Sequence, residues 1–264
     1  MLPRVSQIKC EEADYLLFSA GDLISNILFR TGQWEQHLQV ISSMFYGAVE
    51  APLVLDVGAN IGAYSIPIAK KLQDVGGTVF AFEPQRIVFY QLCGNAVING
   101  LENYFAFQQA VGDYDGVVDI PEIDYHANLN VGAFSLNDEY RKFHGIEESM
   151  KAETSRIPMV TLDSLQLGRP VSLIKIDVEG HEENVIRGGT KLLEHNGFPP
   201  ILFEAWEFDW YKNKKKRLFD YIESLGYEIV SINTTDFIAQ HPAHSVHVEF
   251  DCRDDGVLNM VRTR

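Results

Sequence analysis

The sequence predicts an α/β fold with a mostly parallel, doubly wound sheet, and three observations support this prediction. From residue 53 onward, short apolar runs typical of strands alternate with longer runs of helical periodicity. A chain of 264 residues fits one such domain with additions. Hydrophobic residues make up 46% of the chain and charged residues 22%, so a large core is available. Alternating strands and helices favour a parallel sheet with helices on both faces.

Residues 1–50 precede this alternation and are too few to bury a core of their own. The apolar runs at 15–19 and 26–30 suggest a hairpin or irregular strands, and a following helical pattern stops at Gly47. We expect this segment to lie on the core as a cap, with residues 51–264 forming the main domain.

The predicted strands of the main domain are apolar runs bounded by turn residues: 53–57, 78–83, 105–111, 172–178, 201–206 and 227–232. Helices are expected between them, including a single helix over 182–195. Pro67 lies inside the first helical pattern, so that helix should begin late or bend.

Two further segments depart from the alternation. Residues 112–160 are rich in Gly, Asp and Asn, and we expect them to form an insertion on the substrate side. The tail, with runs at 245–250 and 256–263, should form an antiparallel hairpin at the edge of the sheet.

A glycine turn follows the first predicted strand. Asp56 ends the strand, and Gly58 and Gly62 flank Asn60 before a helix begins. A strand, a tight turn and a helix N-terminus bring a nucleotide-like ligand close to backbone N–H groups. The spacing differs from the Gly-x-Gly-x-x-Gly of dinucleotide binders, and the Asp56 carboxylate would repel a pyrophosphate. S-adenosylmethionine (SAM), which carries an ammonium and a sulfonium but no phosphate, suits this turn.

Glu83 supports the same ligand, because it ends the next strand 21 residues after Gly62. That offset is close to the roughly 20 residues expected of a ribose-binding acid. We assign the turn to the methionine end of SAM, Glu83 to the ribose hydroxyls, and backbone groups of the third strand to the adenine. The predicted SAM-binding residues are Asp56, Gly58, Asn60, Gly62, Glu83, Ala110 and Val111.

Seven motifs follow one another in order across residues 56–204. They are DVGANIGAYS (56–65), FEP (82–84), AVGD (110–113), NVGAFSL (130–136), VTLDSL (160–165), KIDVEGHE (175–182) and ILFE (201–204). In this series the chain resembles the FkbM-type family of SAM-dependent methyltransferases. The resemblance implies a Rossmann-like class I methyltransferase core. It also implies O-methylation of a hydroxyl on a natural product, sugar or lipid-like small molecule. It allows Glu35 to reach the SAM amino group, against the alternative of an exposed helical glutamate.

Methyl transfer requires an aligned acceptor, exclusion of water and, for a hydroxyl, a group that takes its proton. Asp177, Glu179 and His181 follow an apolar strand and are the predicted catalytic residues. The alternative is an acidic first helical turn favoured by the helix dipole. It explains Glu182 and Glu183 better than Asp177, which the apolar strand carries towards the interior.

The acceptor is expected to contact Asn130 and Ser135 of the insertion, although both also suit turns, and Glu204 at the end of the next strand. Glu204 and Asp177 on neighbouring strand ends resemble the metal site of magnesium-dependent catechol-type methyltransferases. Two acids without a third ligand do not predict a metal site, so the need for magnesium stays open.

The net charge of −15 argues against a nucleic-acid partner. The basic run at 212–217 is explained by a solvated helix start. Three widely spaced cysteines predict neither a disulfide framework nor a structural zinc site. No apolar run reaches the length of a membrane span and no leader pattern is seen, so we expect a cytoplasmic protein.

The partner of this protein is therefore predicted to be a small-molecule or peptide acceptor. The sequence leaves the oligomeric state open, with a homodimer as one option. N-methylation of an amide or amine, as on a peptide, is the second prediction. An NAD-dependent oxidoreductase and a non-catalytic SAM-binding protein are the remaining alternatives.

Overall fold

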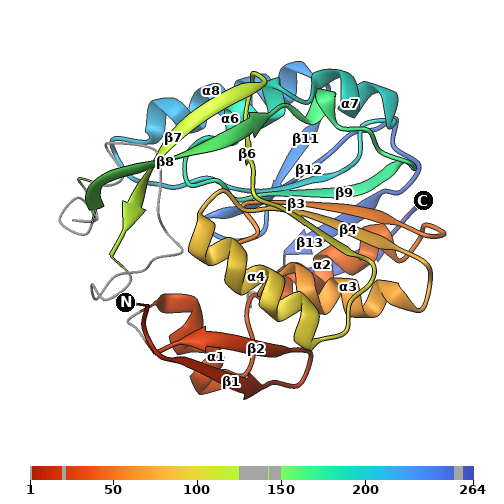
Figure 1. Ribbon diagram of the computed structural model, residues 1–264. Helices are drawn as coiled ribbons and strands as arrows, with labels where there is room; N and C mark the ends of the chain where they lie inside the picture. Colours follow the sequence, from red (N-terminus) through yellow and green to blue (C-terminus); the bar gives the residue numbers. More distant parts are fainter. Residues whose placement is uncertain (1, 20–21, 125–141, 143–149, 253–257) are drawn as a thin grey trace.

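The computed structural model describes residues 2–19, 22–124, 142, 150–252 and 258–264. Five parallel strands form its centre: β3 (Leu53–Val57), β4 (Thr78–Phe82), β5 (Tyr104–Phe107), β9 (Val171–Ile176) and β10 (Ile201–Glu204). Two antiparallel strands, β12 (Asp236–Gln240) and β11 (Glu228–Ser231), complete one edge. The order across this seven-stranded sheet is β11–β12–β10–β9–β3–β4–β5 (Figure 1). The predicted α/β fold with a mostly parallel sheet is confirmed.

Helices cover both faces of the sheet (Figure 1). One face carries α2 (Gln36–Tyr46), α3 (Ser65–Gln73) and α4 (Arg86–Ile98), and the other carries α6 (Glu182–Arg187), α7 (Thr190–His195) and α8 (Lys212–Ser224). α3 begins late, as predicted, so Pro67 lies in its first turn, where the missing N–H breaks no helical bond. Among the described residues, no helix combines the length and apolar character that a membrane crossing requires.

The prediction of a single helix over 182–195 is wrong. Gly188 and Gly189 separate α6 from α7. A Cβ atom on Gly188 would lie 1.9 Å from the carbonyl oxygen of Gly112, so the two backbones touch at this point. Hydrophobic periodicity carries no information about such a contact between distant segments.

The predicted insertion forms a second sheet in its described part. Its strands are β6 (Ala110–Val111), β7 (Gly116–Ile123) and β8 (Met150–Val160), in the order β6–β8–β7. A short 3-10 helix, Leu162–Ser164, then leads to β9. The run at 105–111, predicted as one strand, is therefore divided between the central sheet and this second sheet.

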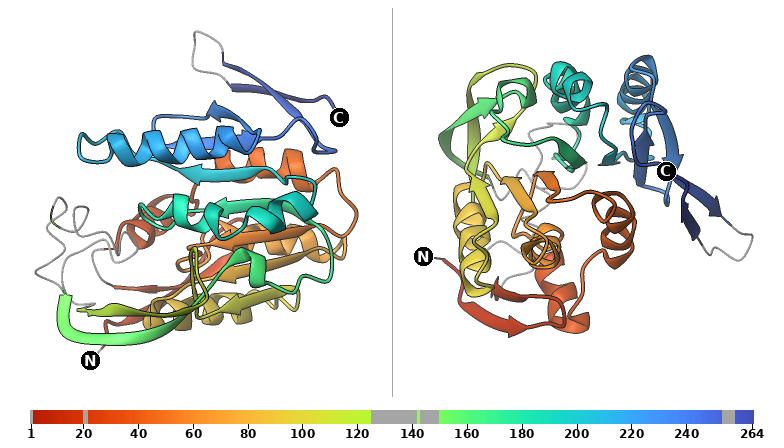
Figure 2. Two further views of the ribbon diagram at one scale, coloured as in Figure 1. Left: turned by 90° about the horizontal axis from the view of Figure 1, so that it is seen from above. Right: turned by 90° about the vertical axis from the view of Figure 1, so that its right-hand side faces the viewer.

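The tail forms the predicted antiparallel hairpin from β13 (Val248–Cys252) and β14 (Leu258–Arg262). This hairpin is a two-stranded sheet of its own that projects from the body of the protein (Figure 2). The antiparallel edge of the central sheet consists instead of β11 and β12, and the sequence analysis did not identify β12. The Gln240 side chain joins the two sheets through hydrogen bonds to the N–H and carbonyl of Val248, both 2.9 Å.

The N-terminal segment consists of the hairpin β1 (Val5–Lys9) and β2 (Asp14–Phe18) followed by α1 (Leu23–Thr31). The run at 26–30 is thus helical, not extended. Side chains of α4 form hydrogen bonds with backbone groups on the open edge of β2. For example, Asn95 Oδ1 accepts a hydrogen bond from the N–H of Leu16 at 2.6 Å. Asn95 Nδ2 also donates to the carbonyl of Ile61 at 2.8 Å. One buried amide therefore joins the N-terminal hairpin to the glycine turn.

Candidate active site

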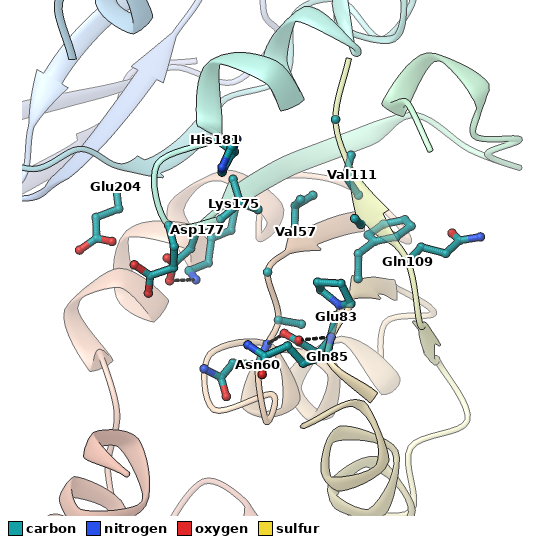
Figure 3. Close-up of a pocket in the computed structure, with 18 of the residues that line it drawn as sticks. Val57, Asn60, Glu83, Gln85, Gln109, Val111, Lys175, Asp177, His181 and Glu204 are labelled. Carbon is teal, nitrogen blue, oxygen red and sulfur yellow. Dashed lines mark hydrogen bonds and ion pairs between the residues drawn. The ribbon is translucent and has the colours of Figure 1, made fainter. Parts of the chain in front are cut away.

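The strand order reverses between β3 and β9, because the chain runs outward from β3 to β5 and then returns to β9. Such a reversal opens a crevice at the C-terminal ends of the strands. A cavity of about 780 Å³ lies there, within the size range of small-molecule sites. Figure 3 shows side chains from the ends of β3, β4, β9 and β10 around it.

The cavity brings together most of the residues predicted from the sequence. Its lining includes Gly58, Asn60, Glu83, Ala110, Val111, Asp177, Glu179, His181 and Glu204. Asp56 and Gly62 are buried and do not line it. Asn130 and Ser135 lie outside the described residues. The described part of the insertion contributes residues of β7 and β8 to the wall.

The backbone N–H groups of residues 58–62 all donate hydrogen bonds inside the protein. Their acceptors are the carbonyl oxygens of Phe82 and Ala59, the Asn60 side chain and the Glu83 carboxylate, at 2.8 to 3.0 Å. Phosphate-binding turns direct such groups at the ligand instead. These five N–H groups are therefore engaged within the protein, and a pyrophosphate would find no free donor among them.

Glu83 holds the turn and also faces the cavity (Figure 3). Its Oε2 accepts the N–H of Asn60 at 2.9 Å and its Oε1 accepts the N–H of Gln85 at 2.8 Å. Each carboxylate oxygen keeps a second lone pair for a ligand. Burial raises the pKa of Glu83 to about 7, while the N–H groups of Gln85 and Asn60 act in the opposite direction.

Asp56 belongs to a buried charge network behind the cavity wall. It is 0% exposed on β3 and lies beside Lys175 of β9 in the sheet register. Lys175 is 6% exposed, and its Nζ is 2.9 Å from Oδ2 of Asp177 and 5.1 Å from the ring centre of Tyr64. Burial raises the pKa of Asp56, and Lys175 and the Ser65 hydroxyl oppose that shift.

Gly62 is a packing residue in this structure. Its φ is 83°, and a Cβ atom there would lie 2.6 Å from Ile66 of α3 and 2.8 Å from Leu92 of α4. The glycine therefore permits both helices to approach the turn.

Glu35 lies in the cavity wall at the start of α2. Its φ of 44° is in the left-handed region, which disfavours residues other than glycine. Its Oε2 is buried, so the alternative of an exposed helical glutamate is wrong. Burial raises the pKa of Glu35 to about 7, and Lys175 opposes this shift.

The turn after β9 carries the predicted catalytic residues and is fixed by Glu182. Glu179 and Gly180 both have positive φ, 54° and 93°. The Oε1 of Glu182 accepts two backbone N–H groups of this turn, at 3.3 and 3.0 Å, and its Oε2 accepts the Tyr211 hydroxyl at 3.0 Å. Glu182 is 2% exposed. It lies in the acidic first turn of α6, as the sequence suggested, and it is also a buried residue that positions the preceding turn.

Carboxylates converge where the C-terminal ends of β9 and β10 meet the cavity. One oxygen each of Asp177, Glu179 and Glu204 lies within 4.8 Å of the others. His181 lines the same region, on the side of the cavity away from Glu83 and Gln85 (Figure 3). Burial raises the pKa of Glu204 well above its ordinary value, and the nearby Asp177 carboxylate adds to the effect. This end of the cavity can accept protons and bind cations.

Lys175 was not identified from the sequence, although its ammonium interacts with Asp56, Asp177 and Glu35. Burial lowers the pKa of Lys175, but Asp177, Asp56 and Glu35 outweigh it and raise the pKa well above its ordinary value. A lysine inside an otherwise apolar strand was the available signal, because a buried ammonium requires acidic partners. Two aromatic residues of the lining, Trp34 and Trp206, were also not assigned.

Residues 56–229 match the methyltransferase FkbM domain. The chain is 25% identical over 182 residues to methyltransferase sdnD of Sordaria araneosa, an overlap of 59% of this chain and 67% of that protein. A solved structure of methyltransferase FkbM from Methylobacillus flagellatus shares 18% identity with a TM-score of 0.47, and the match covers 75% of this chain but 48%, about half, of the other.

A SAM-dependent O-methyltransferase from Thermotoga maritima shares 13% identity with a TM-score of 0.46, over 94% of this chain and 68% of that one. The domain match covers well over half of the chain and includes the turn after β3 and the turn after β9. The protein therefore belongs to the FkbM methyltransferase domain family.

Proposed function

We propose that this protein transfers a methyl group from SAM to a hydroxyl of a small molecule. The observation that carries the proposal is the separation of two groups of polar side chains in one cavity. Asn60 and Glu83 lie at one end, the proposed donor end, and Asp177 and His181 lie away from them at the proposed acceptor end (Figure 3). SAM supplies a methyl group on a positively charged sulfur when it is bound.

The donor end has features that suit SAM. The Glu83 oxygens can each accept one further hydrogen bond, which matches two ribose hydroxyls. The five N–H groups of the turn already donate hydrogen bonds within the protein, so they are not available to bind a phosphate. Ala110 and Val111 also line the cavity, and we assign their backbone groups to the adenine.

The acceptor end has features that suit an organic hydroxyl. Asp177, Glu179 and His181 provide proton acceptors beside the expected methyl group. Trp34 and Trp206 add apolar surface that excludes water and can hold a carbon skeleton. With a net charge of −15, the protein repels nucleic acid, so we propose a small-molecule or peptide acceptor.

The proposal is tested with SAM that carries a radiolabelled methyl group and a panel of hydroxyl compounds, amines and short peptides. Label on hydroxyl oxygen supports the proposal, whereas label only on nitrogen supports the N-methyltransferase alternative. Thermal protection of the protein by S-adenosylhomocysteine and not by NAD supports the donor assignment. Protection by NAD alone would overturn it.

Glu83→Ala is expected to weaken SAM binding by about 1.5–3 kcal/mol, or roughly ten- to hundredfold in Kd, because hydrogen bonds to a charged group are lost. Titration calorimetry with SAM measures this change. The control is Glu102→Ala, which removes an exposed glutamate outside the cavity and should leave Kd unchanged. Equal affinity of wild type and Glu83→Ala would contradict the ribose assignment.

SAM affinity is expected to increase with pH. The pKa of Glu83 is about 7, and only its ionised form accepts hydrogen bonds through both oxygens. Kd should therefore fall as the pH rises from about 6 to about 8. The Glu83→Gln variant should bind more weakly and with a smaller pH dependence, and an unchanged pH slope in this variant would show that another group controls it.

A further inference from the structure

Three carboxylates at the acceptor end are held in place by the backbone of two neighbouring parallel strands. Asp177 and Glu179 follow β9, and Glu204 ends β10. One oxygen of each lies within 4.8 Å of the other two. Glu182 fixes the first turn through two backbone N–H groups, and Glu204 lies opposite Asp236 in the antiparallel pair of β10 and β12. The acids are therefore gathered by the fold.

A second observation points to a small cationic ligand beside these acids. A separate cavity of about 30 Å³ is lined by charged side chains of five residues: Glu35, Asp177, Glu204, Asp236 and Lys175. This volume accommodates about one water-sized particle. The Oε2 atom of Glu35 is buried there without a hydrogen-bond partner in the described part of the chain.

Acidic side chains outnumber basic ones around this small cavity. Glu35, Asp177, Glu204 and Asp236 share it with Lys175, whose Nζ pairs with Asp177 at 2.9 Å, and Asp236 accepts a hydrogen bond from Asn233 at 2.6 Å. A buried carboxylate oxygen without a partner is costly, because it loses its hydration and gains nothing in return. A cation bound at the acid cluster would compensate the repulsion among Asp177, Glu179 and Glu204, two of which share the small cavity with Glu35.

We propose that Asp177, Glu179 and Glu204 bind a divalent cation of the magnesium class at the acceptor end of the cavity. The donor set consists of carboxylate oxygens, which favours a hard cation over zinc or copper. Three protein ligands leave coordination positions of an octahedral ion open towards the main cavity. Such a cation would stabilise the oxyanion of an acceptor hydroxyl held beside it, and His181 would be left to take the proton.

Metal binding itself does not depend on the proposed function, whereas its role in activating the acceptor rests on that function. The test therefore begins with metal alone and no SAM. Calorimetry with Mn²⁺ or Mg²⁺ should show one saturable site in the full-length protein. Terbium should bind the same site with luminescence sensitised by Trp206, which follows Glu204 by two residues and lines the same cavity. Excess Mg²⁺ should remove that signal.

Glu204→Gln and Glu179→Gln should each weaken metal binding by about tenfold or more, because each removes one of three ligands. The matched control is Glu207→Gln, an acid on the same loop that pairs with Lys215 outside the cluster. It should bind metal as the wild type does. Circular dichroism establishes whether each variant is folded. If either Glu204→Gln or Glu179→Gln does not fold, the other still tests the site.

The outcomes separate this proposal from the proposed function. Normal SAM binding without saturable metal binding would overturn the metal site and leave the methyltransferase proposal intact. Metal binding without SAM binding would leave the metal site intact and overturn the methyltransferase proposal. Metal affinity equal in wild type, Glu204→Gln and Glu179→Gln would assign the signal to other surface acids and also overturn the site. Loss of terbium signal on addition of SAM but not of Mg²⁺ would show that the cluster holds the ammonium of the donor instead.

Discussion

Lys175→Met is expected to lower the free energy of unfolding by about 3–5 kcal/mol, because removal of one partner leaves buried charges uncompensated. Lys175 is the ammonium that faces Asp56, Asp177 and Glu35. Methionine has a similar length and volume, so the lost stability measures the contribution of the positive charge of Lys175. For a chain of this size the melting temperature should fall by about 10 °C.

The loss should be greater at about pH 8 than at about pH 5. Burial raises the pKa of Asp56 and of Glu35 in the folded protein. The stability that a raised carboxyl pKa contributes is complete below the unfolded pKa and is lost as pH rises through the folded value. Without Lys175 these folded pKa values rise further, so the variant loses more stability over the same pH range.

Denaturant unfolding of Lys175→Met at both pH values measures this effect. The double variant Lys175→Met/Asp56→Asn removes one uncompensated carboxylate and should regain part of the stability. A double variant less stable than Lys175→Met alone would show that Lys175 does not act by neutralising Asp56. A loss independent of pH would point to packing instead of charge.

Gly58→Ala is expected to lower the free energy of unfolding by about 2–5 kcal/mol and to weaken SAM binding more than tenfold, through strain and overpacking. The φ of Gly58 is 88°, and an added Cβ would lie 1.8 Å from the carbonyl oxygen of Asp177. Relief of this contact must separate the turn after β3 from the turn after β9. The substitution should therefore displace the residues at both ends of the cavity.

The matched control is Gly100→Ala. Gly100 also has a positive φ, 65°, but no atom lies within 4 Å of the added Cβ. This variant should cost about 1 kcal/mol through backbone strain alone and should bind SAM normally. Thermal unfolding and calorimetry on both variants separate the two effects. Equal losses in the two variants would show that the approach of Gly58 to Asp177 is unimportant.

The sequence predicted those parts of the protein in which local pattern and position coincide. Strand ends are visible as apolar runs that stop at a polar residue, and the C-terminal ends of parallel strands meet at one edge. For this reason Glu83, Asp177 and Glu204, which end or follow three different strands, were placed near one another, and the structure gathers them around one cavity.

The features that escaped prediction depend on contacts between distant segments. Asp56 follows the strand pattern as well as Glu83 does, yet its side chain is on the face buried against Lys175. At the break between α6 and α7, Gly188 packs against the backbone of Gly112, which is far away in sequence. Glu182 resembles any acidic helix start until its buried partners are known. Local pattern carries no trace of such partners.

The side chain of Asn95 has a consequence for the whole molecule. It donates a hydrogen bond to the carbonyl of Ile61 in the glycine turn and accepts one from the N–H of Leu16 in β2. The glycine turn and the N-terminal hairpin are therefore held by the same side chain. Trp34 and Glu35, which follow that hairpin, form part of the wall. Loss of the Asn95 side chain would therefore remove hydrogen bonds from the N-terminal hairpin and from the glycine turn at the same time.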